Sequence, residues 1–464
     1  MIYENKDQVK KGCANILAFD DGDVRVLDEA KFQGQLIDDL IYTVVFSPDE
    51  AAKEAAAWLI RRGAAALGIW SASIQPLYEA MGRKDIGGFT VPAINLRGIT
   101  FDAAQAVFRA ALKGKVGPLI FEIARSEIDY TKQRPLEYTC AVTAAAVKTG
   151  WRGPVFLQGD HFQMNAKKFA ADADKETQGV KNLIWEGIEA GFYNIDIDTS
   201  TLVDLSQPTV KEQQRTNFSL AAELTTMIRD LEPEGITISV GGEIGEVGGK
   251  NSTVEELQVF MDGYLEELKK RGGAAKGISK ISVQTGTTHG GVPLADGTVA
   301  KVKIDFDVLE KLSETARVAY GLSGAVQHGA STLPDEAFDR FPATGTAEIH
   351  LATGFQNIIY DSKRFPAELR AKIYDYLKAN MKGEWKEKDT EEQFIYKTRK
   401  KAFGPFKLDL WHLPAEIREG ICAELERQFA FLFDKLKVNG TRDILDTHVP
   451  QVDVPLKMPA ALKG

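Results

Sequence analysis

The feature that most constrains the fold of this chain is an alternation of short apolar runs with longer helical patterns between residues 87 and 352. Turn-forming residues flank each of the eight runs, and amphipathic segments separate them. The runs cover Phe89–Leu96, Pro118–Ile123, Pro154–Leu157, Tyr193–Ile197, Ile236–Val240, Ile278–Val283, Gly324–Val326 and Thr346–Leu351. Eight strand–helix alternations in one stretch predict an α/β protein built on a (β/α)8 TIM barrel.

The segment after the fifth run shows the helical pattern most clearly. Thr253 and Glu256 form a capping box at its start. Apolar residues then recur three or four positions apart along Val254–Leu268, and a Gly-Gly pair ends the segment. An open, doubly wound sheet is the alternative fold. Its usual glycine-rich phosphate turn after the first strand is missing from residues 94–100, so the closed barrel is the better prediction.

Two extensions flank the predicted barrel, which we place at residues 86–362. The N-terminal extension covers residues 1–85. Within it, Ser47-Pro-Asp-Glu50 combines a candidate N-cap with a proline in the first turn and a glutamate three positions on. This pattern predicts an alanine-rich helix that stops at Gly63, because glycine commonly ends a helix.

The C-terminal extension, residues 363–464, is predicted to be helical. Apolar residues recur three or four positions apart along Leu413–Leu436, which predicts an amphipathic helix. We expect its apolar face to pack on the barrel; the other use is a contact between copies, since we also expect a homo-oligomer. The basic run from Lys397 to Lys401 predicts a solvated surface.

Composition excludes several classes of protein. With 44% apolar and 27% charged residues, the chain is typical of a globular protein with a large core. Its net charge of −9 argues against a general binder of nucleic acid or of anionic membranes. The apolar stretch Ala51–Ile69 is interrupted by charged residues and is too polar to span a bilayer.

The cysteines and the N-terminus bear on the compartment. Cys13, Cys140 and Cys422 are far apart and form no CxxC pair, so neither a disulfide framework nor a cysteine zinc site is expected. The stretch Met1–Lys11 is mostly polar and lacks the apolar segment of a signal peptide. We therefore expect a cytoplasmic protein in a reducing environment.

Four of the six histidines lie at or just after predicted strands, namely His161, His289, His328 and His350. In a (β/α)8 barrel the C-terminal strand ends meet at one mouth, so these side chains can share one site. Isolated histidines are more often hydrogen-bonding core residues or substrate contacts. Three at equivalent positions of the third, sixth and seventh strands favour a catalytic zinc site, although another divalent metal is possible with these ligands.

Acidic residues accompany the histidines at the strand ends. Asp160 directly precedes His161. Because neighbouring residues in an extended strand point in opposite directions, we expect one of the two to bind the metal and the other to face the substrate. We assign proton transfer to Asp160. The other acidic residues near strand ends are Asp196, Asp198, Glu243 and Glu246, and the two aspartates either orient histidines or take part directly.

Glycine-rich turns follow the sixth and seventh strands, at residues 288–291 and 328–332. Their backbone N–H groups and hydroxyls suit a phosphate group, and the alternative is that they are only tight turns. Arg97 and Arg125, in the turns after the first and second strands, either bind a second anionic group or point outward.

Five motifs in this order resemble the class II, metal-dependent fructose- and tagatose-bisphosphate aldolase family. They are Gly159-Asp-His161, Ile195-Asp-Ile-Asp-Thr-Ser200, Glu243-Ile-Gly245, Gly286-Thr-Thr-His-Gly290 and His328-Gly-Ala-Ser331. The resemblance runs from about residue 73 to residue 361. It implies a zinc site made of His161, His289, His328 and, in an alternative metal position with Asp198 beside it, Glu243. It also implies a ketose phosphate surrounded by Gly290, Gly329, Ser331 and Thr353.

The reaction that the resemblance implies is cleavage of the C3–C4 bond of a ketose (bis)phosphate such as fructose or tagatose 1,6-bisphosphate. Zinc chelates the C2 carbonyl and C3 hydroxyl oxygens, Asp160 removes the C4 hydroxyl proton, and the metal stabilises the enediolate. His350 stands where family members have an asparagine that contacts the enediolate, so it is also a candidate substrate contact.

Two other functions remain open at this point. His350, Arg97 and Arg125 differ from the family pattern and motivate a metal-dependent ketose C4-epimerase, which would cleave the bond and re-form it after the aldehyde rotates. The other hypothesis is a non-catalytic barrel subunit that supports a partner enzyme. The histidines together with Asp160 argue against this hypothesis.

Overall fold

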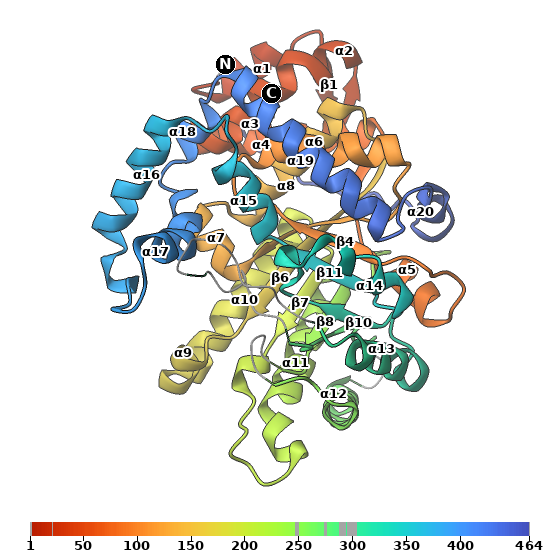
Figure 1. Cartoon of the computed structure of the whole chain (residues 1–464). Helices are drawn as coiled ribbons and strands as arrows, with labels where there is room; N and C mark the ends of the chain where they lie inside the picture. Colours follow the sequence, from red (N-terminus) through yellow and green to blue (C-terminus); the bar gives the residue numbers. More distant parts are fainter. Residues whose placement is uncertain are drawn as a thin grey trace.

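The computed structural model describes residues 2–20, 22–245, 250–272, 276–286, 294 and 304–463. Eight parallel strands form a closed barrel at its centre (Figure 1). They are β4 (Val91–Asn95), β5 (Ile120–Ala124), β6 (Gly153–Gln163), β7 (Asn194–Asp198), β8 (Ser239–Glu243), β9 (Lys280–Val283), β10 (Ala325–Gln327) and β11 (Glu348–Leu351). Each strand pairs with the next, and β11 pairs with β4, which closes the ring. The prediction of a (β/α)8 barrel is confirmed.

Helices surround the barrel and carry the chain from each strand to the next. They are α6 (Thr100–Gly114), α7 (Arg125–Thr131), α8 (Pro135–Thr149), α9 (Ala166–Ala171), α10 (Ala173–Ala190), α11 (Val210–Leu231), α12 (Val254–Gly272), α13 (Phe306–Tyr320), α14 (Arg340–Ala343) and α15 (Thr353–Asp361). All eight predicted apolar runs overlap a strand. The fifth strand begins later than predicted, because the backbone N–H of Ile236 closes a turn with the carbonyl of Pro233.

The N-terminal extension contains three strands that the sequence did not predict, and one of them, β3 (Ile69–Ala72), joins the barrel sheet as its ninth strand. Its elements are α1 (Lys6–Cys13), the hairpin β1 (Leu17–Asp20) and β2 (Asp23–Val26), α2 (Glu29–Lys31), α3 (Ile37–Phe46), α4 (Glu50–Ala66), β3 (Ile69–Ala72) and α5 (Gln75–Gly82). Strand β3 pairs in parallel with the first residues of β6, from Gly153 to Phe156. The division of the chain at residues 85 and 362 stays a prediction.

Helix α4 starts and ends differently from the prediction. The side chain of Asp49, not Ser47, caps it by accepting a hydrogen bond from the backbone N–H of Ala52 at 2.7 Å. The helix also continues through Gly63 to Ala66. A Cβ atom at Gly63 would lie 2.6 Å from the ring of Phe32, so this glycine serves a close helix contact and does not end the helix.

The C-terminal extension packs on the barrel. It contains α16 (Ala367–Asn380), α17 (Glu391–Thr398), α18 (Lys407–Trp411), α19 (Ala415–Lys435) and α20 (Arg442–His448). The amphipathic helix α19 lies along α6 (Figure 1), and its residues Ile421, Leu425, Phe429 and Leu432 are buried. The expected packing of its apolar face on the barrel is confirmed, while a homo-oligomer stays a prediction.

The basic run in this extension is not the solvated surface that the sequence predicted. Arg399 is only 4% exposed, and its Nη1 lies 2.5 Å from Asp361 Oδ1. Lys400 faces a cavity described below. Only Lys397 and Lys401 fit the prediction, as partly exposed residues; Lys397 pairs with the largely buried Asp389 and Lys401 with the exposed Glu384. The run follows a tight 3-10 turn, residues 399–402, which directs adjacent side chains to different environments.

The three cysteines are free and buried. Burial raises the pKa of the Cys13 thiol and of the Cys140 thiol to about 12, and it also raises the pKa of Cys422. Within the described part of the chain, no helix has both the length and the apolar character needed to cross a membrane.

We expect the folded protein to resist thiol reagents at pH 8. An ordinary thiol has a pKa of about 8.5, so the raised pKa values keep these thiols protonated in the folded state. Titration with a chromogenic disulfide should detect essentially no thiolate until guanidinium is added, and then all three cysteines. Rapid labelling of the native protein would show that the thiols are accessible and would contradict this account.

Candidate functional site

A cavity of about 390 Å³ opens at the C-terminal ends of the barrel strands. The predicted site residues that line it are Arg97, Arg125, Asp160, His161, Glu243, His328, Gly329, Ser331, His350 and Thr353. Asp198 does not line the cavity but contacts His161 from behind. His289, Gly290 and Glu246 lie outside the described residues. The structure therefore brings together side chains from six barrel strands or the loops after them, as the barrel topology predicts.

Asp160 and His161 both reach this cavity, which the strand geometry did not predict. The pairing of β6 with β7 shifts register between Gly159 and Phe162, and His161 has a φ of 41°. This positive φ interrupts the alternation of an extended strand. The expectation that the two side chains point to opposite sides is therefore wrong: His161 Nε2 lies 3.9 Å from Asp160 Oδ1.

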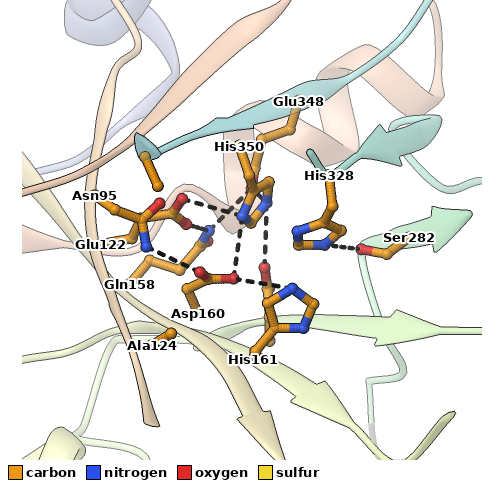
Figure 2. A network of polar contacts seen from close by, with 12 residues as sticks. Asn95, Glu122, Ala124, Gln158, Asp160, His161, Ser282, His328, Glu348 and His350 are labelled. Atoms are coloured by element: carbon orange, nitrogen blue, oxygen red, sulfur yellow. Dashed lines mark hydrogen bonds and ion pairs between the residues drawn. The ribbon is translucent and has the colours of Figure 1, made fainter. Parts of the chain in front are cut away.

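Two carboxylates hold the imidazole of His161 from one side. Its Nδ1 lies 2.9 Å from Asp198 Oδ2 and 3.3 Å from Glu243 Oε2. A carboxylate on one ring nitrogen fixes the orientation of an imidazole and directs the other nitrogen toward a ligand. On the other side, the His161 ring lies 4.1 Å from the His328 ring, centroid to centroid (Figure 2).

These side chains have the chemistry and spacing of a metal site. Asp160, His161 and His328 each offer a ligand atom, and the three atoms lie within 4.8 Å of one another. His161, Asp198 and Glu243 form a second set that overlaps the first. The Oγ of Ser282 lies 3.0 Å from His328 Nε2 and orients that ring. Mixed nitrogen and oxygen donors suit zinc and similar divalent cations, so the residues present fit the predicted metal.

The charges of the site favour an ionised Asp160. Burial alone would raise the pKa of this carboxyl. The nearby imidazoles of His161 and His350 have a larger, opposite effect, so the pKa lies well below its usual range. Asp160 is therefore an acceptor at neutral pH, as a proton-removing group must be. Burial and the adjacent Asp198 raise the pKa of Glu243 to about 8.

The Asp160 carboxylate is also fixed in position on both of its oxygens. The side-chain amide of Asn95 donates to Oδ2 at 2.9 Å, and His350 Nδ1 lies 3.2 Å from Oδ1 (Figure 2). The other nitrogen of His350 lies 2.7 Å from Glu348 Oε1. Both nitrogens of His350 thus contact protein carboxylates, while its ring borders the cavity.

Arg97 and Arg125 both line the cavity, so the alternative that they point outward is wrong. Arg97 Nε lies 2.6 Å from Glu127 Oε1, and its Nη1 donates to Thr353 Oγ1 at 3.2 Å. Arg125 Nη1 lies 2.5 Å from Glu176 Oε1. Arg97 is therefore adjacent to Thr353 and its predicted phosphate turn, whereas Arg125 lies beside a different carboxylate on α10.

The turn after β10 lies against the end of β11 at the border of the cavity. Gly329 has a φ of 69°, a left-handed conformation that glycine adopts without strain. Ser331 Oγ accepts a hydrogen bond from the backbone N–H of Ala352 at 2.8 Å, which ties this turn to the end of β11. Gly329, Ser331 and Thr353 consequently border the same part of the cavity.

Lys400 and Tyr130 border the cavity beside Arg97, and neither belongs to a sequence motif that would mark it as a site residue. Lys400 Nζ lies 5.8 Å from the centre of the Tyr130 ring, and it forms no ion pair with any carboxylate in the described ranges. Burial and the like charge of Arg97 lower the pKa of Lys400. The buried hydroxyl of Tyr130 has no hydrogen-bond partner among the described residues. The sequence does not distinguish Lys400 from Lys397 and Lys401, and its place at the cavity becomes apparent only in the folded structure.

The sequence model of the fructose-bisphosphate aldolase class-II family matches residues 77–401, well over half of the chain. The chain belongs to this family. The match includes the barrel, the cavity and Lys400, so the resemblance inferred from the motifs is confirmed. Members of this family typically depend on a divalent metal. The histidine and acidic clusters of this chain are of the kind that can hold such an ion.

Solved structures show the same barrel fold. One is described as a probable tagatose 6 phosphate kinase from Sinorhizobium meliloti 1021, with a TM-score of 0.54 and 17% identity; the match covers 77% of this chain and 99% of that one. Another is a fructuronate-tagaturonate epimerase from Cohnella laeviribosi, with a TM-score of 0.54 and 11% identity, covering 76% and 82%. At such identities the likeness shows the fold alone.

Proposed function

We propose that this class II aldolase family member is a metal-dependent aldolase that cleaves and forms the C3–C4 bond of a ketose phosphate or bisphosphate, such as fructose or tagatose 1,6-bisphosphate. The observation that carries the proposal is the position of Asp160, an ionised carboxylate beside the imidazoles of His161 and His328 in one cavity. Family membership supports the reaction class. A homo-oligomer and a cytoplasmic location are further parts of the proposal.

His161 and His328 would hold the metal, together with His289 and with Glu243 in an alternative position. Zinc is our first choice, because imidazole and carboxylate donors suit it. When bound, a divalent cation supplies Lewis-acid stabilisation of the negative charge that develops on the substrate. Asp198 and Ser282 would keep the two imidazoles oriented for this task.

Asp160 would act on the C4 hydroxyl of the sugar. In the cleavage direction it takes the hydroxyl proton, the C3–C4 electron pair moves to the C3 fragment, and the C4 fragment leaves as an aldehyde. In the reverse direction the same carboxyl returns the proton. Asn95 and His350 hold both carboxylate oxygens, so the group is aligned before substrate binds.

Cationic and hydroxyl groups would bind the anionic end of the sugar. Arg97, Thr353 and Ser331 lie together at the edge of the cavity, next to the turn at Gly329. The ammonium of Lys400 and the Tyr130 hydroxyl add two donors to this group. Charge-assisted hydrogen bonds of this type suit a phosphate. Arg125 would bind a second anionic group, when the substrate has one.

We expect Lys400→Met to raise the KM for a ketose phosphate by about 10- to 100-fold, because a hydrogen bond to a charged group contributes about 1.5–3 kcal/mol. The kcat should change little, since Lys400 belongs to none of the described clusters that could hold the metal. Lys401→Met is the matched control, because it removes the same charge from the same turn at a surface pair with Glu384. An equal rise in KM for both variants would exclude a specific role of Lys400.

A substrate panel tests the proposed reaction. The purified protein, loaded with zinc, is assayed with fructose 1,6-bisphosphate, tagatose 1,6-bisphosphate and the free ketoses, and triose phosphate is detected with coupling enzymes. Triose phosphate release supports the aldolase. The absence of cleavage and of interconversion with every sugar would overturn the enzyme assignment.

A ketose C4-epimerase is the second candidate. The observation that favours it is His350, an imidazole in contact with Asp160 where the family pattern has an asparagine. An epimerase would re-form the bond before the fragments leave. Interconversion of fructose- and tagatose-type sugars without triose release in the same panel would support this candidate against the aldolase.

A further inference from the structure

A second set of ligand-type side chains lies in the barrel interior. Glu122, Asp196, Glu348 and His350 each offer a ligand atom, and these atoms lie within 4.8 Å of one another. None of the four residues is more than 5% exposed. Three carboxylates and an imidazole form a donor set that hard divalent cations accept. We call this set the deep cluster; by composition alone it would be a second metal site.

The ammonium of Lys280 already occupies the deep cluster. Lys280 Nζ donates to Glu348 Oε1 at 2.5 Å, to Asp196 Oδ2 at 3.0 Å and to the side-chain oxygen of Gln158 at 2.8 Å. An ammonium has three N–H donors, and these three acceptors use all of them. Burial alone would lower the pKa of Lys280, but Asp196 and Glu348 raise it above its usual value. The lysine therefore stays charged and neutralises carboxylates that a metal would otherwise bind.

Gly241 on the adjacent strand β8 makes room for this ion pair. A Cβ atom at Gly241 would lie 2.3 Å from Asp196 Oδ1 and 2.9 Å from Lys280 Cε. Any other residue would displace the ammonium or the carboxylate, so the ion pair between Lys280 and Asp196 requires a glycine at position 241.

The deep cluster is connected to Asp160 through His350 (Figure 2). Glu348 accepts from Tyr78 on one oxygen, and its other oxygen contacts both Lys280 and His350. His350 Nδ1 then lies 3.2 Å from Asp160 Oδ1. Because Glu348 Oε1 contacts both the Lys280 ammonium and His350 Nε2, the position of Lys280 determines the orientation of His350 and, through it, of Asp160.

We propose that Lys280 is a positioning residue, which fills the deep cluster in place of a divalent cation and, through Glu348 and His350, fixes the Asp160 carboxylate toward the substrate. The positioning part rests on the role proposed for Asp160. The occupation of the deep cluster does not, since it can be measured without any substrate.

The experiment compares Lys280→Met and the charge-balanced double variant Lys280→Met/Glu348→Gln with the unchanged protein. Each protein is equilibrated with Mn²⁺, and bound metal per chain is measured by elemental analysis and by electron paramagnetic resonance. We expect Lys280→Met to bind one more cation per chain than the unchanged protein, because the deep cluster becomes free. The double variant should return to the original number, because one carboxylate ligand is gone.

Turnover gives the second readout. For the double variant we expect kcat to fall by about 100-fold with KM nearly unchanged. A misplaced catalytic group slows the chemical step but does not weaken substrate binding. An unchanged metal count in Lys280→Met, or wild-type kcat in the double variant, would overturn the proposal. If Lys280→Met does not fold, the kcat of the double variant tests the proposal instead. If the unchanged protein turns over no sugar, the proposed function is wrong. The number of bound metal ions then still tests whether Lys280 fills the deep cluster.

Discussion

Replacing His161 or His328 by alanine is expected to abolish zinc binding and C3–C4 cleavage together. Each imidazole belongs to the ligand set that converges at the barrel mouth, so its removal opens the coordination shell. A bound cation supplies several kcal/mol of transition-state stabilisation, and we therefore expect kcat/KM to fall by at least about 1,000-fold. Elemental analysis of the purified variants, alongside kinetics, measures both losses.

His412→Ala is the matched control for these two variants. His412 is an exposed histidine of the C-terminal extension; its Nε2 lies 2.6 Å from the Tyr42 hydroxyl, and it is not among the described residues that line the cavity. This variant should retain metal and turnover. Circular dichroism must show that all three variants are folded, since His328 packs against the rings of His161 and His350. Retention of stoichiometric zinc by His161→Ala would exclude this residue as a ligand.

Replacing Asp160 by alanine is expected to separate metal binding from catalysis. The variant keeps both imidazoles and should bind zinc, but it lacks the group that removes the C4 hydroxyl proton. Positioned acid–base groups contribute about 100- to 10,000-fold, so kcat should fall by that factor while metal content stays constant. Combined metal analysis and steady-state kinetics with a cleavable bisphosphate test this directly.

Asp129→Ala provides the control for Asp160→Ala. Asp129 is an exposed carboxylate that borders the same cavity and has no part in the proposed chemistry. Its removal changes the cavity charge by the same amount and should leave kcat near the original value. Turnover of Asp160→Ala at the original rate would contradict the acid–base role. Loss of zinc from Asp160→Ala would instead make this carboxylate a metal ligand.

The barrel was predictable because its strands carry local apolar patterns. The residues of β5 are buried throughout, and four of its five residues are apolar, so the strand appears as a short apolar run between turns. Strand order then follows from chain order, so the convergence of His161, His328 and Glu243 needed no side-chain information. Strand β3 was missed because its four residues, Ile69–Ala72, pair with a segment of β6 far along the chain.

The rest of the site depends on interactions that no local pattern contains. The positive φ of His161 arises where β6 changes register, and it reverses the expected direction of one side chain. Lys280 has the sequence setting of an ordinary polar residue at a strand start, but three distant strands supply its acceptors. Lys400 likewise differs from Lys401 only in what the folded chain places opposite it.

Anomalous diffraction at the zinc absorption edge, from crystals of the zinc-loaded protein, locates the metal without assuming its ligands. We expect one strong peak at the barrel mouth, bonded to His161, His328 and His289, whose position the same map would establish. A peak bonded to other side chains, or no peak at a zinc concentration that saturates activity, would contradict it.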